Sequence, residues 1–182
     1  NALLDEAGFR RGAGNTRFSL RLVPILNGED VPLLATFVQQ SLAAVGIRVE
    51  IVNLDIAGAL STVYRDWNFD LATGWHQFRG DPAVSTTVWY RSGSPKGAPW
   101  TNQWGWQSDR VDALTDAAAT ELDPAKRRQM YAEWTRAVND ELPIWMITER
   151  EFQAAVSRRV GNAGNTPRWG SGDWHDTFLA PA

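Results

Sequence analysis

A strand, helix and strand pattern in the first third of the sequence constrains the fold more than any other feature. Residues 18–23 (FSLRLV) and 47–52 (IRVEIV) each alternate apolar and polar side chains, which is typical of a strand with one buried face. Between them, over residues 34–45, apolar side chains recur at three- and four-residue spacing, which predicts an amphipathic helix. Because two parallel strands need a long crossover, usually a helix, the pattern predicts a parallel βαβ unit.

The elements that follow extend this pattern into an α/β fold, a mostly parallel sheet flanked by helices. We expect a helix over 57–64, a strand over 69–73, helices over 82–90, 109–121 and 124–140, and short strands over 143–147 and 152–156. The segment 91–107 is rich in Gly, Pro, Ser and Trp and has no periodicity. Loops of this length commonly have a function or are mobile.

Composition and motifs exclude several classes of function. The net charge is -3 and the sequence has no basic stripe, so we do not expect a nucleic-acid partner. No apolar run is long enough to cross a bilayer, and none of the common hydrolase, phosphate-binding or dinucleotide motifs occurs. His175 lies beside Asp176, but we interpret it as an exposed tail residue. We therefore expect no enzyme activity, no metal site and no cofactor.

An ordered set of short motifs runs along most of the chain. It comprises LLDEAGF at 3–9, VGIRV at 45–49, FDL at 69–71, GW at 74–75, DP at 81–82, SDRVD at 108–112, DPAKRR at 123–128 and DELPI at 140–144. This set resembles the peptide- and nickel-binding family of extracellular solute-binding proteins, which includes the dipeptide- and oligopeptide-binding receptors. The resemblance implies two lobes that close on a solute, in the manner of a type II-like periplasmic binding protein.

Within that architecture, the resemblance identifies this chain with the carboxy-terminal lobe, and we expect it to be a fragment. Residues 1–149 would form the lobe, and residues 150–182 a tail that returns to the other lobe, which is absent from this chain. The implied function is that of the substrate-binding component of an ABC importer, which delivers a peptide-like or other polar solute to the permease. We expect a monomer, located in the periplasm or, in a Gram-positive host, outside the membrane as a lipoprotein. The expected solute is an oligopeptide, an opine or a saccharide-like molecule.

The candidate ligand site lies where the third strand ends, because loops at the carboxyl ends of parallel strands converge on the binding crevice. Family members resembling this chain place that loop in the cleft. We assign to it Thr73, Gly74, Trp75, His76, Gln77, Phe78 and Arg79. From the tryptophan-rich segment 100–106 we add Asn102, Trp104 and Trp106. The structural alternatives are that Trp75 fills the core, that Arg79 faces solvent and that the indoles bury the underside of the loop.

The choice of solute is left open by one departure from the family pattern. Related peptide receptors carry an aspartate shortly after the loop tryptophan, where it pairs with the α-amino group of the peptide, whereas this chain has Phe78. We interpret Asp81, beside Pro82, as a helix cap. Free-peptide binding is thus less favoured. The alternatives are an anionic solute group that pairs with Arg79, and a sugar ring or aromatic solute on which Trp75, Trp104 and Trp106 stack. The ten tryptophans also leave open a different class, a carbohydrate-binding module or a fragment of a glycan-active enzyme.

Overall fold

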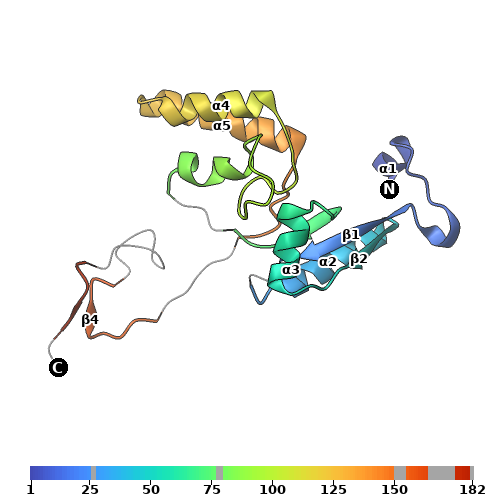
Figure 1. Cartoon of the computed structure of the whole chain (residues 1–182), viewed down its shortest axis with the longest axis horizontal. Helices are drawn as coiled ribbons and strands as arrows, with labels where there is room; N and C mark the ends of the chain where they lie inside the picture. The colour runs from blue at the N-terminus through green and yellow to red at the C-terminus, as the bar shows by residue number, and fades with distance from the viewer. Residues whose placement is uncertain (26–27, 77–79, 150–154, 164–174, 181–182) are drawn as a thin grey trace. The chain divides into compact units, whose positions relative to one another are not determined.

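The computed structural model describes residues 1–25, 28–76, 80–149, 155–163 and 175–180 (Figure 1). The chain forms two compact units. The first comprises Asn1–Gln77 with Arg91–Ser108, and the second comprises Phe78–Tyr90 with Asp109–Ala182. The sequence also predicts a boundary between residues 149 and 150, where the tail would leave this lobe for the other one. This boundary stays a prediction.

The first unit contains a three-stranded parallel sheet in the order β2-β1-β3. Its strands are β1 (Phe18–Pro24), β2 (Ile47–Ile51) and β3 (Leu71–Thr73). Each strand lies within one residue of its predicted start or end, except that β3 begins two residues late. The carboxylate of Asp70 accepts the backbone N–H of Arg21 at 2.7 Å, so a side chain takes the place of a ladder bond there. The α/β prediction is confirmed.

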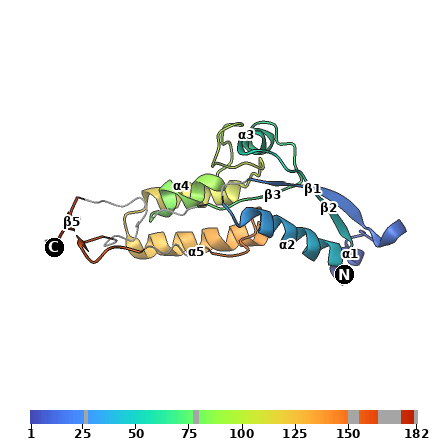
Figure 2. The same ribbon diagram turned by 90° about the horizontal axis from the view of Figure 1, so that it is seen from below.

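Helices cover both faces of this sheet, as Figure 2 shows. Helix α2 (Val31–Ala44) lies on one face, and α3 (Ile56–Leu60) with the π-helical turn η2 (Ser61–Arg65) lies on the other. Because alternate residues of a strand point to opposite faces, Leu22 packs with the α2 core and Val23 with the α3 core. The chain also begins with α1 (Ala2–Glu6) and η1 (Ala13–Asn15).

The second unit is mostly helical. Its main helices are α4 (Asp109–Thr120) and α5 (Pro124–Glu141), close to their predicted ranges. The carboxylate of Asp123 accepts the backbone N–H groups of Ala125 and Lys126, which explains why α5 begins where it does. The two helices are joined in the core by Trp134, whose Nε1 donates to Thr115 Oγ1 at 2.9 Å.

The predicted helix over 82–90 is wrong as a single α-helix. The chain instead makes two 3₁₀ turns, η3 (Pro82–Val84) and η4 (Thr86–Trp89). Ser85 between them has φ −140° and ψ −85°, outside the helical region. Three consecutive β-branched residues follow Ser85, and such side chains lose rotamer freedom in an α-helix.

The predicted strand over 143–147 is also wrong, because these residues have no β-ladder. Trp145 and Met146 are 69% and 54% exposed. An apolar segment becomes a strand only when its backbone pairs with a neighbour, and a periodic pattern cannot supply that neighbour. Residues 155 and 156 of the last predicted strand are not in a strand either, and residues 152–154 lie outside the described part of the chain. A short antiparallel pair that was not predicted, β4 (Val160–Gly161) with β5 (Phe178–Leu179), occurs nearby in sequence.

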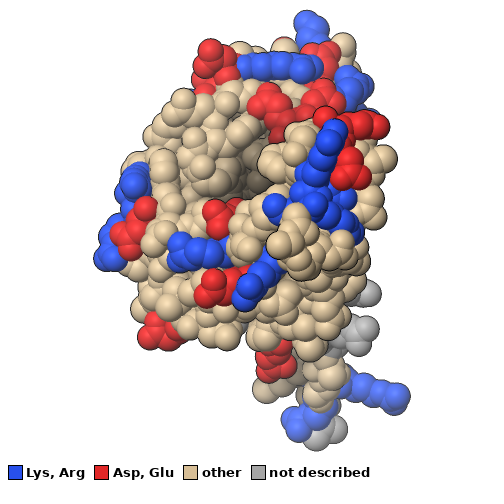
Figure 3. Space-filling model, turned by 90° about the vertical axis from the view of Figure 1, so that its right-hand side faces the viewer, with Lys and Arg blue, Asp and Glu red and all other residues tan. Residues whose placement is uncertain are grey.

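One face of the molecule carries charges of both signs. On the face drawn in Figure 3, Lys and Arg side chains are interspersed with Asp and Glu among the coloured residues. No described helix has both the length and the apolar character that a membrane span requires.

Candidate functional site

Two segments of the first unit that are distant in sequence meet at Trp100. The ring of Trp100 lies 5.7 Å from that of His76, nearly perpendicular to it at 82°. The Trp100 ring also lies 6.0 Å from the ring of Tyr64, at an interplanar angle of 61°. A backbone bond from Gly97 N–H to the carbonyl of Tyr64, at 2.8 Å, holds the same stretch of the 91–108 loop. The tryptophan-rich loop is therefore docked on η2 and on the segment that leaves β3.

Asn102 ties the two ends of this loop together. Its Nδ2 donates to the carbonyl of Trp106 at 2.6 Å and to that of Arg91 at 3.2 Å. The residue is only 4% exposed. A second tie runs from the N–H of Ser108 to Ser92 Oγ at 3.1 Å. The amide nitrogen of Asn102, a predicted ligand residue, thus organises the loop, and only its oxygen remains for another partner.

Two tryptophans, Trp100 of the tryptophan-rich segment and Trp67, which the sequence did not single out, are held in an unusual backbone conformation. Trp67 has φ 53° and Trp100 has φ 65°, a region that bulky residues rarely adopt. Trp67 packs on Gly105, where an added Cβ would lie 2.6 Å from the indole ring. The Nζ of Lys96 lies 4.7 Å from the centroid of that ring. Trp67 and Trp100 are 38% and 41% exposed, so packing holds two aromatic rings partly open to solvent.

The charge state of this region follows from burial. Desolvation lowers the pKa of His76 to about 4, so the imidazole is neutral at pH 7. Burial likewise raises the pKa of the Tyr64 hydroxyl to about 12, although the backbone of Trp100 offsets part of the rise. The segments 71–76 and 100–106 contain no Lys, Arg, Asp or Glu. These two segments are therefore uncharged at neutral pH, and charged side chains lie beside them in Lys96, on the Trp67 ring, and in the Arg65–Asp66 pair.

Several buried polar atoms of the same two segments have no hydrogen-bond partner in the described structure. They are Thr73 Oγ1, Asn102 Oδ1, Gln103 Oε1 and Trp104 Nε1. All four lie within four residues, along the chain, of the His76–Trp100 contact. A buried polar group without a partner reduces stability by about 1–3 kcal/mol. We therefore expect these atoms to bind water or another partner in the full-length protein.

The predicted site residues are thus brought together only in part. Thr73, Gly74, Trp75 and His76 leave the carboxyl end of β3 and are half-buried. Trp104 and Trp106 are half-buried as well. Gln77, Phe78 and Arg79 lie outside the described residues. Contact of any of these side chains with a solute stays a prediction.

Asp81 has the capping role that its sequence context indicates. Its Oδ1 accepts the N–H of Ala83 at 2.9 Å at the start of η3. The same carboxylate binds the guanidinium of Arg127 at 2.8 and 3.1 Å. These bonds to Arg127, together with the N–H of Ala83, hold the pKa of Asp81 below its usual value. Asp81 is therefore occupied within the second unit.

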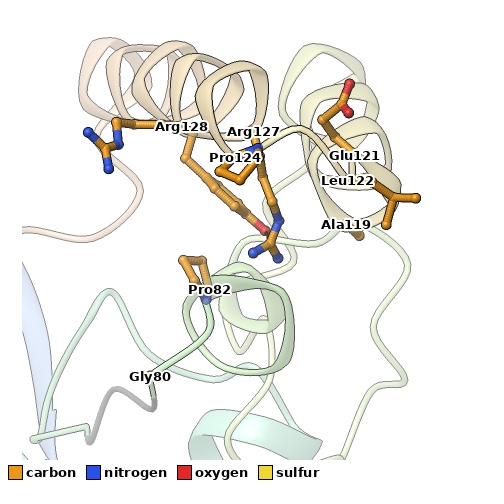
Figure 4. Close-up of a pocket in the computed structure, with 9 residues that line it drawn as sticks. Gly80, Pro82, Ala119, Glu121, Leu122, Pro124, Arg127 and Arg128 are labelled. Atoms are coloured by element: carbon orange, nitrogen blue, oxygen red, sulfur yellow. Dashed lines mark hydrogen bonds between the residues drawn. The ribbon is translucent and has the colours of Figure 1, made fainter.

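A hollow of about 750 Å³ lies beside this ion pair in the second unit (Figure 4). Its lining is Gly80, Pro82, Ala119, Glu121, Leu122, Pro124, Arg127, Arg128 and Tyr131. The guanidinium of Arg127 is already committed to Asp81 and lies 5.2 Å from the ring centroid of Tyr131. Leu122 on its rim is 94% exposed.

Metal binding finds no support among the residues that the structure describes. They contain no group of three or more His, Cys, Asp or Glu side chains that could hold a metal ion.

Comparison with protein families gives one match over most of the sequence. The model described as bacterial extracellular solute-binding proteins, family 5 Middle, matches residues 1–133. The chain belongs to this family. The resemblance found in the sequence is thereby confirmed, and the family is one of solute-binding proteins rather than enzymes.

Curated relatives agree with this assignment. The dipeptide-binding protein of Pseudomonas aeruginosa strain PAO1 is 24% identical over 160 residues, which cover 87% of this chain and 29% of that protein. The di/tripeptide-binding protein 3 of strain UCBPP-PA14 gives the same identity and coverage. The chain therefore spans less than a third of the length of these relatives.

Solved structures show the same fold. AppA from Clostridium difficile superposes with a TM-score of 0.77 at 20% identity, over 98% of this chain and 36% of that one. DppA from Helicobacter pylori, in complex with the peptide STSA, gives 0.64 at 24% identity, over 78% of this chain and 26% of that one. NikA from Staphylococcus aureus, in complex with Ni(L-His)2, gives 0.65 at 16% identity, over 78% of this chain and 29% of that one. The prediction that the chain has the fold of a periplasmic binding protein lobe is confirmed.

Proposed function

We propose that this chain is the solute-contacting lobe of the substrate-binding component of an ABC importer. The observation that carries the proposal is the docking of the 91–108 loop against the end of β3 through Trp100 and His76. In parallel α/β sheets, ligands bind outside the carboxyl ends of the strands, and this junction lies at that edge. Membership of a solute-binding family supports this role, and not the alternative of a carbohydrate-binding module or a glycan-active enzyme.

The mechanism follows from a cleft between two lobes. A solute that contacts both lobes binds the closed form better than the open one, so it shifts the population toward closure. The permease then recognises the closed form and receives the solute. We infer a monomer that works outside the cytoplasmic membrane, in the periplasm or as a surface lipoprotein, with residues 150–182 returning to the other lobe.

Names of related proteins indicate the range of solutes. DppA from Helicobacter pylori holds a peptide, and NikA from Brucella suis holds Fe(III)-EDTA. AgaA from Agrobacterium holds agropinic acid. For this chain we propose a small polar solute that is peptide-like, opine-like or saccharide-like, bound in part by Thr73, Gly74, Trp75 and His76.

A thermal-shift screen of the full-length protein tests the proposal. The panel comprises di- and oligopeptides, neutral oligosaccharides, opines and nickel chelates. A solute present at about 100 times its dissociation constant stabilises the protein by about 2.7 kcal/mol, which raises the melting temperature by several degrees. We expect one class to do so, with the shift reduced in Trp75→Ala and retained in Trp145→Ala, whose side chain is exposed in the second unit. If no class shifts the melting temperature, the proposed function is refuted.

A further inference from the structure

The loop formed by residues 91–108 is attached to the first unit by non-covalent contacts and not by its backbone. The chain enters the loop from Tyr90 and leaves it at Asp109, and both of these residues belong to the second unit. The hydrophobic cores on the two faces of the sheet are built from residues that lie between positions 4 and 72. Separation of the loop from the sheet therefore breaks no β-ladder and removes no member of either core.

The loop also holds its own shape. Asn102 is 4% exposed, and its amide nitrogen donates to the carbonyls of Arg91 and Trp106, which joins the two ends of the loop. Nearby, Thr101 Oγ1 donates to the carbonyl of Ala98 at 2.8 Å. Both partners of each of these bonds lie in the loop, so the bonds are kept when the loop moves as a body. Compact loops whose ends lie close together are packed by their own side chains in this way.

The ring contacts between the loop and the rest of the first unit gather at two tryptophans. Trp67, which follows η2, packs on Gly105 of the loop. Trp100 of the loop contacts Tyr64 of η2 and His76, which follows β3. The two contact points therefore involve different residues on both sides, and both depend on the position of the same loop.

These contacts bury only part of each tryptophan. The side chains of Trp67 and Trp100 are 38% and 41% exposed. The Nζ of Lys96 lies 4.7 Å from the centroid of the Trp67 ring, but Lys96 is exposed, and exposed cation–π contacts are weak. Trp67 also has φ 53°, a conformation that persists only where its surroundings enforce it. We therefore expect the loop to open at a lower free energy than that of global unfolding.

We propose that residues 91–108 form a preassembled lid, which docks on η2 and on the residues after β3, and leaves them, as one body. Because the same body carries Gly105 and Trp100, weakening either contact point shifts the equilibrium at both. The lid rests on contacts within the first unit and goes beyond the proposed function. Its link to that function is that a solute in contact with both the loop and residues 73–76 would hold the lid docked.

The test is fluorine NMR relaxation dispersion of the full-length protein labelled with fluorotryptophan, with each resonance assigned by a single Trp-to-Phe substitution. Gly105→Ala places a methyl group 2.6 Å from the Trp67 ring, so it opposes docking. Because overpacking of this kind changes an equilibrium by about fivefold or more, we expect the undocked population to rise by that factor. The rise should appear as the same exchange process at Trp67 and at Trp100.

Two further variants sharpen the test. Gly93→Ala lies in the same loop at φ 72° with no atom within 4 Å, so it strains the loop without touching Trp67. A loop that moves as a body should keep its wild-type undocked population in this variant. His76→Gln removes the ring contact of Trp100 from the side of β3 and should raise the exchange at Trp67 as well. Trp134, which is buried in the second unit, should report none of these changes.

Every other outcome overturns the lid. A change at Trp67 alone in Gly105→Ala would mean a local adjustment, and the absence of exchange at both rings would mean a fixed loop. An equal rise in Gly93→Ala would mean that the loop unfolds when it opens, and an equal change at Trp134 would mean global unfolding. If Gly105→Ala does not fold, His76→Gln decides the question, and unchanged exchange at Trp67 in that variant contradicts the proposal. The proposed function is judged separately, by the thermal-shift panel.

Discussion

His76 should make the protein less stable as the pH falls below neutrality. Burial lowers its pKa from 6.5 to about 4. Between these two values the unfolded chain binds a proton that the folded chain does not, so acid favours unfolding. The contribution of His76 is constant above pH 6.5 and is lost as the pH falls from there toward 4.

The magnitude follows from the size of the pKa change. Each pKa unit corresponds to about 1.4 kcal/mol, so the full effect is about 3 kcal/mol, of which about 2 kcal/mol is lost by pH 5. The side chain is mostly buried in its contact with Trp100, so solvent screening reduces this figure little.

The assay is urea unfolding of the full chain at pH 7.5 and pH 5, with wild type and His76→Gln compared at each pH. Carboxylates titrate in both proteins, so the difference between them isolates His76. We expect the stability of wild type relative to His76→Gln to fall by about 2 kcal/mol between the two pH values. The chain has only one other histidine, His175, which is present in both proteins and therefore cancels from the comparison. Equal acid sensitivity of wild type and His76→Gln would refute the reasoning.

Three further predictions concern packing, and each is checked by urea unfolding of the full chain. Thr115→Val should cost about 1–3 kcal/mol, because it leaves the buried Nε1 of Trp134 without the acceptor at 2.9 Å. Gly105→Ala should cost about 1 kcal/mol or more, because Gly105 has φ 62° and the added methyl group would overlap Trp67. Asp123→Ala should cost about 1 kcal/mol, because it removes the N-cap of α5.

Conservative variants distinguish the loss of these specific interactions from a general loss of stability on substitution. Thr115→Ser keeps the hydroxyl and should recover most of the loss. Asp123→Asn keeps a capping oxygen and should stay near wild type. Gly93→Ala places the same methyl group at a similar positive φ with no atom within 4 Å, so it should show the backbone cost without the overlap. A loss as large in Gly93→Ala as in Gly105→Ala would contradict the packing argument for Trp67.

The periodicity of the sequence predicted correctly those helices and strands that bury one side along much of their length. Strands β1 and β2 and helix α2 show this, because their apolar residues alternate or recur along one face of the sheet. Helix α5 begins at a local signal, because the carboxylate of Asp123 accepts the N–H groups of Ala125 and Lys126, two and three residues further on. The predicted helix over 82–90 is interrupted at Ser85, whose backbone is not helical. Residues 143–147 have no partner strand. The periodicity of the sequence carries information about neither feature.

The site was predicted less completely than the fold. The end of β3 was located correctly, because strand ends follow from the same alternation as the strands. Trp67 was not considered, and Trp100 was considered only as part of the tryptophan-rich segment, because their exposure depends on a left-handed backbone and on tertiary contacts with Gly105 and His76. The dual role of Asn102 was missed for a similar reason, since its amide bonds join residues on both ends of a loop.

The most direct test of the central claim is hydrogen–deuterium exchange of the full-length protein with and without the solute that raises its melting temperature most. The account predicts that amides of residues 73–79 and 100–106 are protected together when solute is bound, because the two segments meet at the contact between Trp100 and His76. Protection confined to other parts of the chain, with these two segments unchanged, would contradict the assignment of the site.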